Sequence, residues 1–306
     1  MKTIAALMTT FVVASFAIAE TTELKFEGAV TEVYKKASGD DLRIYIFNPA
    51  GHKAGDSKPA IVFFFGGGWN GGTPGQFEQH CRFLASRGMV AMTADYRVKT
   101  RQGTTPKECV ADGKSAVRWV RANAKRLGVD PDRIAAGGGS AGGHVGTTTG
   151  VIDGFDDPSD DTSVSSRSNA LVLFNPVYDN GPKGYGHERV KEYWEKFSPA
   201  QNITKDDAPA VVFLGTEDPL IPVATAEKFK ADMIAAGLKS ELHLYEGQPH
   251  GFFNQNKGGK EIFIDTLVKM DEFLQDIGYL EGEPTEEQLK AVLNPEKPAK
   301  EKKEKS

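Results

Sequence analysis

The sequence predicts an α/β fold in which one mostly parallel sheet of about eight strands carries helices on both faces. Two observations lead to this prediction. The apolar runs 62–65 and 211–214 show no alternation with polar residues, which is typical of strands that are covered on both faces. Beyond the first two strand-like segments, strand-like and helix-like stretches alternate along the chain, and that order favours parallel pairing.

Taken in order, the first two predicted strands have no helix between them and therefore form an antiparallel start. The predicted strands are 24–33, 42–47, 60–65, 89–94, 133–137, 170–174, 210–214 and 241–245. A helix is predicted at 76–87. A second is predicted over 106–127, where small and apolar residues recur at helical spacing. These residues are Val110, Gly113, Val117, Val120, Ala124 and Leu127.

The run 137–144 reads Gly-Gly-Gly-Ser-Ala-Gly-Gly-His and directly follows a predicted strand. Within it, Gly138, Ser140 and Gly142 satisfy G-x-S-x-G, the pattern of a nucleophile elbow, in which a serine occupies a strained turn between strand and helix. The same run also satisfies G-x-G-x-x-G, a dinucleotide-binding pattern. That pattern is expected with an acidic residue about 20 positions further on. There the chain instead has the irregular acidic segment 156–161, so the elbow is the favoured interpretation.

A serine nucleophile needs a base, an acid that orients the base, and donors for the developing oxyanion. The base is predicted to be His250, which lies in a loop framed by glycine and proline after a predicted strand. Asp218 follows another predicted strand and is the expected acid, with its neighbour Glu217 as the alternative. His144 lies one helical turn beyond Ser140 and is expected to pack under the elbow.

The predicted strand 60–65 ends in the sequence Gly66-Gly67-Gly68-Trp69. Glycines at such a place let bare backbone N–H groups approach a substrate oxygen. The chain order serine, acid, histidine is that of α/β-hydrolases and differs from the chymotrypsin and subtilisin orders.

Five motifs together resemble the hormone-sensitive-lipase-like esterases of the α/β-hydrolase superfamily, and more narrowly the acetyl and feruloyl esterase-like carbohydrate esterases. They are Phe65-Gly66-Gly67-Gly68-Trp69, Asp95-Tyr96-Arg97, Gly138-Gly139-Ser140-Ala141-Gly142-Gly143, Asp218-Pro219-Leu220 and Pro249-His250-Gly251-Phe252. The resemblance implies an oxyanion hole formed by the backbone of Gly67, Gly68 and Ala141. Phe65 stands where these esterases usually have a histidine, so the resemblance leaves open how this loop is held.

The resemblance also implies a serine esterase that works through an acyl-enzyme, without a cofactor, and removes acetyl or other small acyl groups from carbohydrate esters. A serine peptidase of the same fold and a non-catalytic or nucleotide-binding α/β protein are the alternatives. The expected substrate is a small-molecule or oligosaccharide ester. The formal net charge of −5 argues against nucleic acid or an anionic membrane as partner.

The domain organisation is predicted as a signal peptide at 1–19, a catalytic domain at 20–282 and a charged, disordered tail at 283–306. Lys2, the apolar run 4–16 and a small-x-small site before Glu20 indicate export to the periplasm or the exterior. At the start of the tail, 285–288 matches a capping box that could begin a short helix. In an oxidising compartment Cys81 and Cys109 could pair, but helices on opposite faces of the sheet are expected to keep them apart.

Two segments, 153–169 and 175–202, do not fit the sheet and are predicted as lid insertions over Ser140. The first is acidic and could hold calcium, but it lacks the regular spacing of a dedicated loop, so no metal site is predicted. The second is aromatic and could stack on a sugar or an aryl acyl group. The predicted substrate contacts are Trp69, Tyr178, Tyr185 and Trp194, with ordinary packing within the lid as the alternative.

Overall fold

The computed structural model describes residues 24–293 of the chain. Its centre is an eight-stranded sheet with the strand order β1-β2-β4-β3-β5-β6-β7-β8. Pairing is antiparallel between β1 and β2 and between β2 and β4, and parallel between the other neighbours. The strands are β1 (Val30–Ala37), β2 (Asp40–Phe47), β3 (Lys58–Phe64), β4 (Val90–Ala94), β5 (Val129–Gly139), β6 (Ala170–Phe174), β7 (Ala210–Gly215) and β8 (Ser240–Tyr245). The predicted sheet and its antiparallel start are confirmed.

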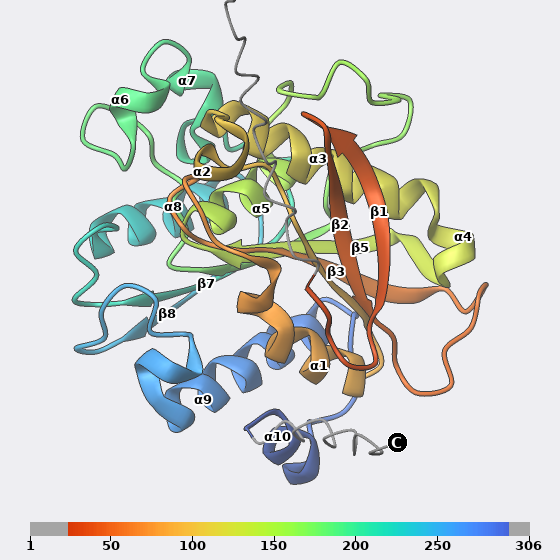
Figure 1. Cartoon of the computed structure of the whole chain (residues 1–306). Coiled ribbons are helices and arrows are strands. Elements are labelled where there is room, and N and C mark those ends of the chain that lie inside the picture. Colours follow the sequence, from red (N-terminus) through yellow and green to blue (C-terminus); the bar gives the residue numbers. More distant parts are fainter. Residues whose placement is uncertain (1–23, 294–306) are drawn as a thin grey trace, which may run out of the picture.

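Helices cover both faces of the sheet (Figure 1), with α3, α5 and α8 on one face and α1 and α9 on the other. The α-helices are α1 (Glu78–Ser86), α2 (Lys99–Gln102), α3 (Pro106–Ala122), α4 (Ala124–Leu127), α5 (Ala141–Val151), α6 (His187–Val190), α7 (Trp194–Phe197), α8 (Val223–Ala235), α9 (Gln255–Asp276) and α10 (Glu286–Leu293). Two short 3-10 helices occupy Pro74–Phe77 and Pro199–Gln201.

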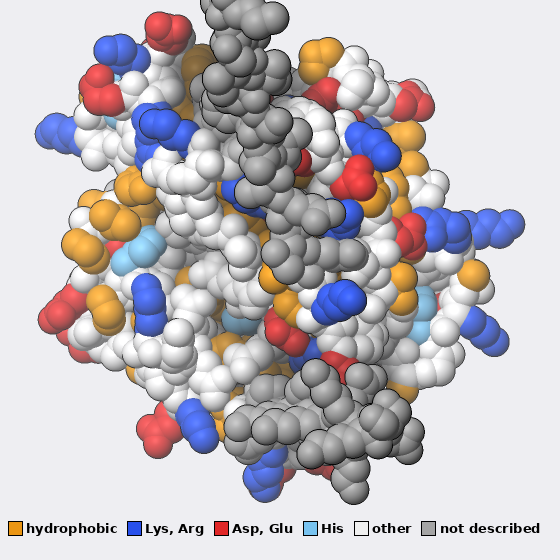
Figure 2. Space-filling view, in the orientation of Figure 1, with side chains coloured by type: hydrophobic (Ala, Val, Ile, Leu, Met, Phe, Trp, Pro, Cys, Tyr) orange, Lys and Arg blue, Asp and Glu red, His pale blue; other side chains and the backbone are white. Residues whose placement is uncertain are grey.

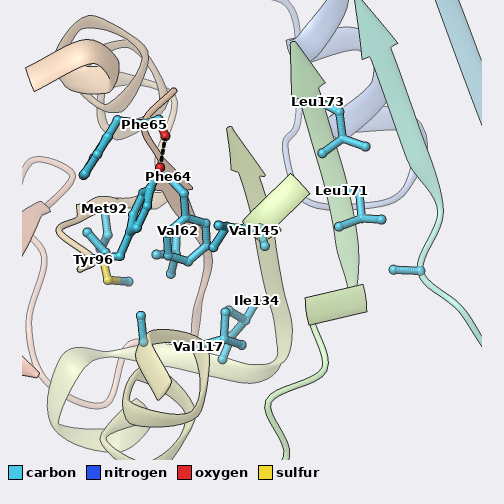
Figure 3. Close-up of a cluster of buried hydrophobic side chains, with 14 of the residues drawn as sticks. Val62, Phe64, Phe65, Met92, Tyr96, Val117, Ile134, Val145, Leu171 and Leu173 are labelled. Carbon is cyan, nitrogen blue, oxygen red and sulfur yellow. Dashed lines mark hydrogen bonds between the residues drawn. The ribbon is translucent and has the colours of Figure 1, made fainter. Parts of the chain in front are cut away.

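The central strands bury side chains on both of their faces. In β3, Val62 and Phe64 belong to the hydrophobic cluster beneath α3 and α5, whereas Ile61 and Phe63 belong to the cluster on the other face. Figure 3 shows the first cluster, where Val145 of α5 lies against the two β3 side chains. Burial on both faces explains why these strands show no alternation of polar and apolar residues.

Several predicted boundaries were wrong. The first strand begins at Val30 and not at residue 24, and it extends through Lys35, whose ammonium turns inward to Asp112 at 2.8 Å. The two lysines near its end, Lys35 and Lys36, are the reason that the predicted strand stops too early, at residue 33. The predicted helix 106–127 is interrupted at Asn123, whose side-chain amide donates to the Trp119 carbonyl at 2.9 Å.

The tail predicted as disordered from residue 283 includes the ordered helix α10. Its predicted capping box forms, because Thr285 and Gln288 exchange hydrogen bonds of 2.9 and 3.2 Å. Val292 is buried and packs with Leu289 and Leu293 into the cluster beneath α1. The spacing of these apolar side chains lets one face of the helix pack on the domain. Residues 294–306 and the predicted signal peptide lie outside the described residues.

The two cysteines lie on opposite faces of the sheet, as expected. Cys81 of α1 and Cys109 of α3 are both buried and unbonded.

Over the described residues visible in Figure 2, acidic and basic side chains are mixed on this face of the molecule. Within residues 24–293, no helix is both long and apolar enough to cross a bilayer.

Candidate active site

Ser140 lies in the turn that joins the end of β5 to the first residue of α5. Its backbone has φ 55° and ψ −121°, a conformation that L residues rarely adopt and that marks a strained turn. The neighbouring glycines are required by space. A Cβ on Gly138 would lie 2.4 Å from the carbonyl oxygen of Phe64, and one on Gly142 would lie 2.1 Å from the same atom. The turn therefore has the backbone geometry predicted for a nucleophile elbow.

The structure brings Ser140, His250 and Asp218 into one hydrogen-bonded chain. Nε2 of His250 lies 2.9 Å from the Ser140 Oγ, and Nδ1 lies 2.7 Å from Oδ2 of Asp218. The side chain of Asp218 is fully buried and that of His250 is 20% exposed. Because Nδ1 faces a carboxylate, the proton of the neutral ring belongs on Nδ1, which leaves Nε2 as an acceptor facing the hydroxyl.

The sheet explains why residues so far apart in sequence meet. Ser140 follows β5, Asp218 follows β7 and His250 follows β8, so all three lie beyond the carboxyl ends of parallel strands. The backbone N–H groups of Leu220 and Ile221 both donate to Oδ1 of Asp218, at 2.8 and 3.0 Å. These bonds leave Oδ2 for the imidazole and hold the carboxylate in place.

Glu217, the alternative acid, is exposed. Its backbone N–H donates to the Gln248 carbonyl at 3.1 Å. The carboxylate that contacts the imidazole is that of Asp218. The imidazole is thus paired with the shorter of the two neighbouring carboxylate side chains.

The glycine loop after β3 lies beside the nucleophile. A Cβ built on Gly66 would be 3.3 Å from the Cβ of Ser140. Gly67 and Gly68 have φ values of 132° and 63°, and a Cβ on Gly67 would lie 2.2 Å from the Gly71 carbonyl oxygen. Within the described residues, no hydrogen bond to protein uses the N–H groups of Gly67 or Gly68. These two N–H groups are therefore not occupied by protein acceptors, which an oxyanion hole requires of its donors.

The loop is held although Phe65 replaces the usual histidine. The hydroxyl of Tyr96 donates to the Phe65 carbonyl at 2.6 Å, drawn dashed in Figure 3, and the two rings stack at 4.1 Å. Oε1 of Gln76 accepts from the Gly66 N–H at 2.6 Å, and its amide donates to Oδ1 of Asn254 at 3.2 Å. An aromatic stack and a glutamine therefore hold this loop from both sides.

Comparison with known proteins agrees with this geometry. The apo structure of Thermogutta terrifontis esterase 2 superposes with a TM-score of 0.82 at 44% identity, and the match covers 85% of this chain and 98% of that one. The chain belongs to the esterases of the α/β-hydrolase fold. The BD-FAE family model matches residues 44–182 of this esterase-family chain, and the dienelactone hydrolase family model matches residues 184–278.

Curated relatives are more distant. Isoprenylcysteine alpha-carbonyl methylesterase of Arabidopsis thaliana is 28% identical over 240 residues, which are 70% of this chain and 56% of that protein. Esterase LipC of Mycobacterium tuberculosis is 30% identical over 220 residues, 63% of this chain and 53% of its own length. The chain thus spans about half the length of these curated relatives.

The structure buries Trp69, which the sequence predicted as a substrate contact of this esterase-family chain. Its side chain is 1% exposed, and its ring lies edge-on to His144 at 5.2 Å and against Tyr185 at 5.6 Å. Its backbone has φ 59° and follows the two left-handed glycines of the loop. Trp69 therefore anchors the glycine loop after β3, residues 66–69, in the protein interior. This loop is called the oxyanion loop below, after its proposed role.

Tyr178, another predicted substrate contact, also lies in the protein interior. It is fully buried, and its ring stacks on Phe229 of α8 at 4.7 Å. Burial, assisted by the nearby carboxylate of Asp218, raises the pKa of Tyr178 far above its ordinary value. The aromatic composition of the segment could not separate this core tyrosine from the partly exposed Tyr185 and Trp194, which remain predicted contacts.

An arginine that sequence analysis missed joins the 175–202 segment to the oxyanion loop. Nη1 of Arg189, on α6, donates to the carbonyl oxygen of Gly68 at 2.6 Å. The guanidinium lies 4.8 Å from the centre of the Trp69 ring and 5.3 Å from that of Tyr185. Its place in the sequence carries no motif, so only the folded chain reveals this contact.

His144 packs under the elbow, as predicted. It is fully buried, and Nε2 lies 3.1 Å from the carbonyl oxygen of Phe197 in α7. Burial lowers the pKa of His144 to about 4, so its ring is neutral near pH 7. It links the first turn of α5 to the 175–202 segment.

The segment 153–169 is not a lid over Ser140. It begins beyond the far end of α5, and its aspartates turn to α3 and β1. Asp157 pairs with Lys35 at 2.7 Å, and Asp160 pairs with Arg118 at 2.6 Å. The carboxylates of Asp156, Asp157 and Asp160 are thus neutralised by protein cations. The described residues contain no group of three or more His, Cys, Asp or Glu suited to a metal ion.

Proposed function

We propose that this chain is a serine carboxylester hydrolase that acts through an acyl-enzyme on esters of small acyl groups. The observation that carries the proposal is the hydrogen-bonded chain from Asp218 through His250 to the Ser140 hydroxyl, with distances of 2.7 and 2.9 Å. This is the arrangement of an activated serine nucleophile with an oriented base.

In the proposed mechanism, Ser140 Oγ attacks the ester carbonyl carbon while Nε2 of His250 takes the hydroxyl proton. The carbonyl oxygen becomes an oxyanion, which accepts hydrogen bonds from the N–H groups of Gly67, Gly68 and Ala141. Collapse of this intermediate breaks the bond to the alcohol oxygen, which receives the proton from Nε2. Water then attacks the acyl-serine by the same proton route and releases the acid.

The proposed preference for small acyl groups is supported by solved structures of a related esterase. Structures of Thermogutta terrifontis esterase 2 with propionate and with butyrate bound match this chain at 43% identity, with TM-scores of 0.80 and 0.81. Another structure of that esterase is phosphorylated by paraoxon, which agrees with a nucleophile that attacks activated esters. The carbohydrate alcohol rests on the motif resemblance alone, with Tyr185 and Trp194 as its proposed contacts.

Export is part of the proposal. The basic residue, apolar run and small-x-small site within residues 1–19 support a signal peptide that directs the enzyme to the periplasm or the exterior. N-terminal sequencing of the protein recovered from the periplasm or the culture medium would test this, and a mature chain beginning at Glu20 is expected. A chain that retains Met1 or stays in the cytoplasm would contradict it.

The central test combines covalent labelling with turnover. A fluorophosphonate probe should label wild type and leave Ser140→Ala unlabelled, and the variant should lose several orders of magnitude in hydrolysis of 4-nitrophenyl acetate. Turnover should fall as the acyl chain of the 4-nitrophenyl ester lengthens. Near-full hydrolysis by Ser140→Ala would refute the nucleophile. Faster cleavage of aminoacyl amides than of acetate esters would favour the peptidase alternative, and NAD binding without turnover would favour the nucleotide-binding one.

A further inference from the structure

Asn175, which follows the last residue of β6, lies against the reacting nitrogen of the catalytic histidine. Its side chain is fully buried. Nδ2 of its carboxamide lies 3.4 Å from Nε2 of His250, on the atom that also faces the Ser140 Oγ. No sequence motif singles this residue out, because Asn175 is one asparagine after an apolar strand.

The other end of the same carboxamide holds the histidine loop. Oδ1 of Asn175 accepts a hydrogen bond of 3.0 Å from the backbone N–H of Gly251, the residue next to His250. This bond settles which end of the amide is which, because an NH2 group turned toward Gly251 would place two donors face to face. The NH2 group is therefore the end that faces Nε2.

We propose that Asn175 is a positioning residue that holds the His250 loop and keeps Nε2 available as a proton acceptor. This inference rests on the proposed esterase function. In the tautomer with its proton on Nδ1, Nε2 is an acceptor and is compatible with the neighbouring amide N–H. If the ring takes a proton from solvent, Nε2–H and the amide N–H become two donors in contact, which disfavours the charged ring. The Nε2–H bond formed during turnover lies in the plane of the ring. The amide N–H disfavours rotation of the ring toward Asn175, so that this bond keeps pointing at the serine or the leaving alcohol oxygen.

The other titratable groups around the His250 ring do not contact Nε2. Asp218, after β7, faces Nδ1 on the opposite side of the ring. Lys257, from the first turns of α9, brings its Nζ within 3.0 Å of a Cβ built on Gly251, beside the loop backbone. Tyr178, close enough to Asp218 for their charges to interact, is a buried phenol and stays neutral. Among the described side chains, the contacts of Nε2 are with Ser140 and Asn175.

The backbone offers a competing, purely structural reason for an asparagine at this position. Asn175 has φ 35°, in the left-handed region where asparagine, aspartate and glycine are the tolerated residues. Glycine and aspartate both satisfy that backbone but change the side chain in different ways. The variants Asn175→Gly and Asn175→Asp therefore separate the role of the carboxamide from that of the backbone.

The experiment is the pH profile of kcat/KM for 4-nitrophenyl acetate, whose acid limb reports protonation of the free enzyme's base. In Asn175→Asp, a carboxylate replaces the NH2 group beside Nε2 and stabilises the charged ring. The acid limb should move up by about one pH unit or more. In Asn175→Gly, loss of the loop anchor should lower kcat/KM about tenfold, with a smaller upward shift of the limb.

Gln248→Glu is the matched control. It makes the same change from amide to carboxylate on the same loop, two residues from His250, where the side chain lies against Gly215. Its acid limb should stay within about 0.3 pH unit of wild type, because a solvent-screened charge without direct contact has little effect.

A second readout does not depend on turnover. The Cε1–H resonance of His250, assigned by its absence in His250→Gln, is followed by NMR against pH in wild type and in Asn175→Asp. Its midpoint should move upward with the acid limb. If wild type hydrolyses no ester, the proposed function fails while this measurement still tests the contact. Equal midpoints in wild type and a folded Asn175→Asp, or full activity of Asn175→Gly, would overturn the inference.

Discussion

The two segments predicted as lids are held in opposite ways. The first, 153–169, is fixed by charge, since its aspartates pair with Lys35 of β1 and with Arg97 and Arg118. The second, 175–202, is fixed by aromatic packing around Trp69 and by the bond from Arg189 to the oxyanion loop. One segment is therefore built into the wall of the domain, whereas the other forms part of the support of the active site. Exclusion from the sheet, by itself, does not make a segment a lid.

If this comparison is right, mutations at the first segment should reduce stability and spare catalysis, and mutations at the second should do the reverse. The largest effect is expected in the ion-pair cluster that holds the first segment, at Asp112 of α3. Its side chain is fully buried between Lys35 at 2.8 Å and Arg97 at 2.7 Å, the two cations that also pair with Asp157 of that segment. Asp112→Ala removes the fully buried carboxylate that the two cations share and leaves them only the partly exposed Asp157, which should cost about 3–5 kcal/mol of unfolding free energy.

Urea denaturation would measure that loss, and kcat/KM well below the melting temperature should stay within about twofold of wild type. Asp153→Ala is a control in the same region, because its side chain is 92% exposed and its contact with Arg167 is 3.7 Å. That variant should change stability by less than about 0.5 kcal/mol. Loss of activity in a folded Asp112→Ala would show that the charged cluster also supports the active site.

The next largest effect is expected at Arg189. Arg189→Ala removes the donor to the Gly68 carbonyl and frees two consecutive left-handed residues, Gly68 and Trp69. Loss of a single oxyanion donor costs about 10²–10³ in kcat. Because Arg189 acts on the adjacent peptide and not on the oxyanion, we expect kcat to fall about 10- to 100-fold at nearly constant KM.

Lys191→Ala is the matched control on the same segment, since Lys191 is exposed and pairs with Glu188 at 3.3 Å. Steady-state kinetics and the rate of fluorophosphonate labelling should fall together in Arg189→Ala and stay near wild type in Lys191→Ala. A drop in melting temperature with unchanged kcat would assign Arg189 to stability and would remove the contrast between the two segments.

A smaller effect should come from the pH dependence of Asp157. Burial opposes its ionisation, but hydrogen bonds from Lys35 and Ser159 outweigh burial and hold the pKa of Asp157 below its ordinary value. A lowered pKa means that the folded state binds the proton less readily than the unfolded state. The stabilisation is therefore complete above about pH 5 and is lost as pH falls through and below about 4.

Urea denaturation of wild type and Asp157→Asn across pH 2.5–7 would measure this. The stability difference should be under about 1 kcal/mol near neutrality, because the pair is partly exposed, and should shrink below about pH 4. A difference that grows as the pH falls would contradict the assignment.

The smallest effect is expected at Trp194, a partly exposed predicted substrate contact. Trp194→Ala should raise KM for aryl or sugar acetate esters about two- to fivefold, as expected for loss of one stacking contact, and should leave kcat unchanged. Ethyl acetate, whose alcohol offers no ring to stack on, provides the comparison. Equal changes in KM for both substrates would place Trp194 in lid packing alone.

Much of the site could be predicted because its signals are local. Each of three residues requires a particular backbone conformation: a serine between glycines, an acid at a strand end and a histidine in a glycine and proline loop. Their order along the chain reduces the number of folds that fit the sequence. The burial of Trp69 and Tyr178 could not be predicted, because an aromatic residue has the same letter whether it is buried or exposed. Their burial comes from α5, α8 and the 175–202 segment, which pack around them from distant parts of the chain.

The sheet, the turn at Ser140 and the three residues of the hydrogen-bonded chain could be predicted from the sequence, because strand periodicity and special backbone angles depend on near neighbours. Tertiary structure alone decided what surrounds them: Gln76 and Tyr96 in place of a histidine, Arg189 on the oxyanion loop, and Asn175 on the base. These contacts join residues 31 to 121 positions apart, apart from the Gly66–Gln76 bond. Each requires only a hydrogen-bonding group at the right point in space, and many positions along a chain could supply one.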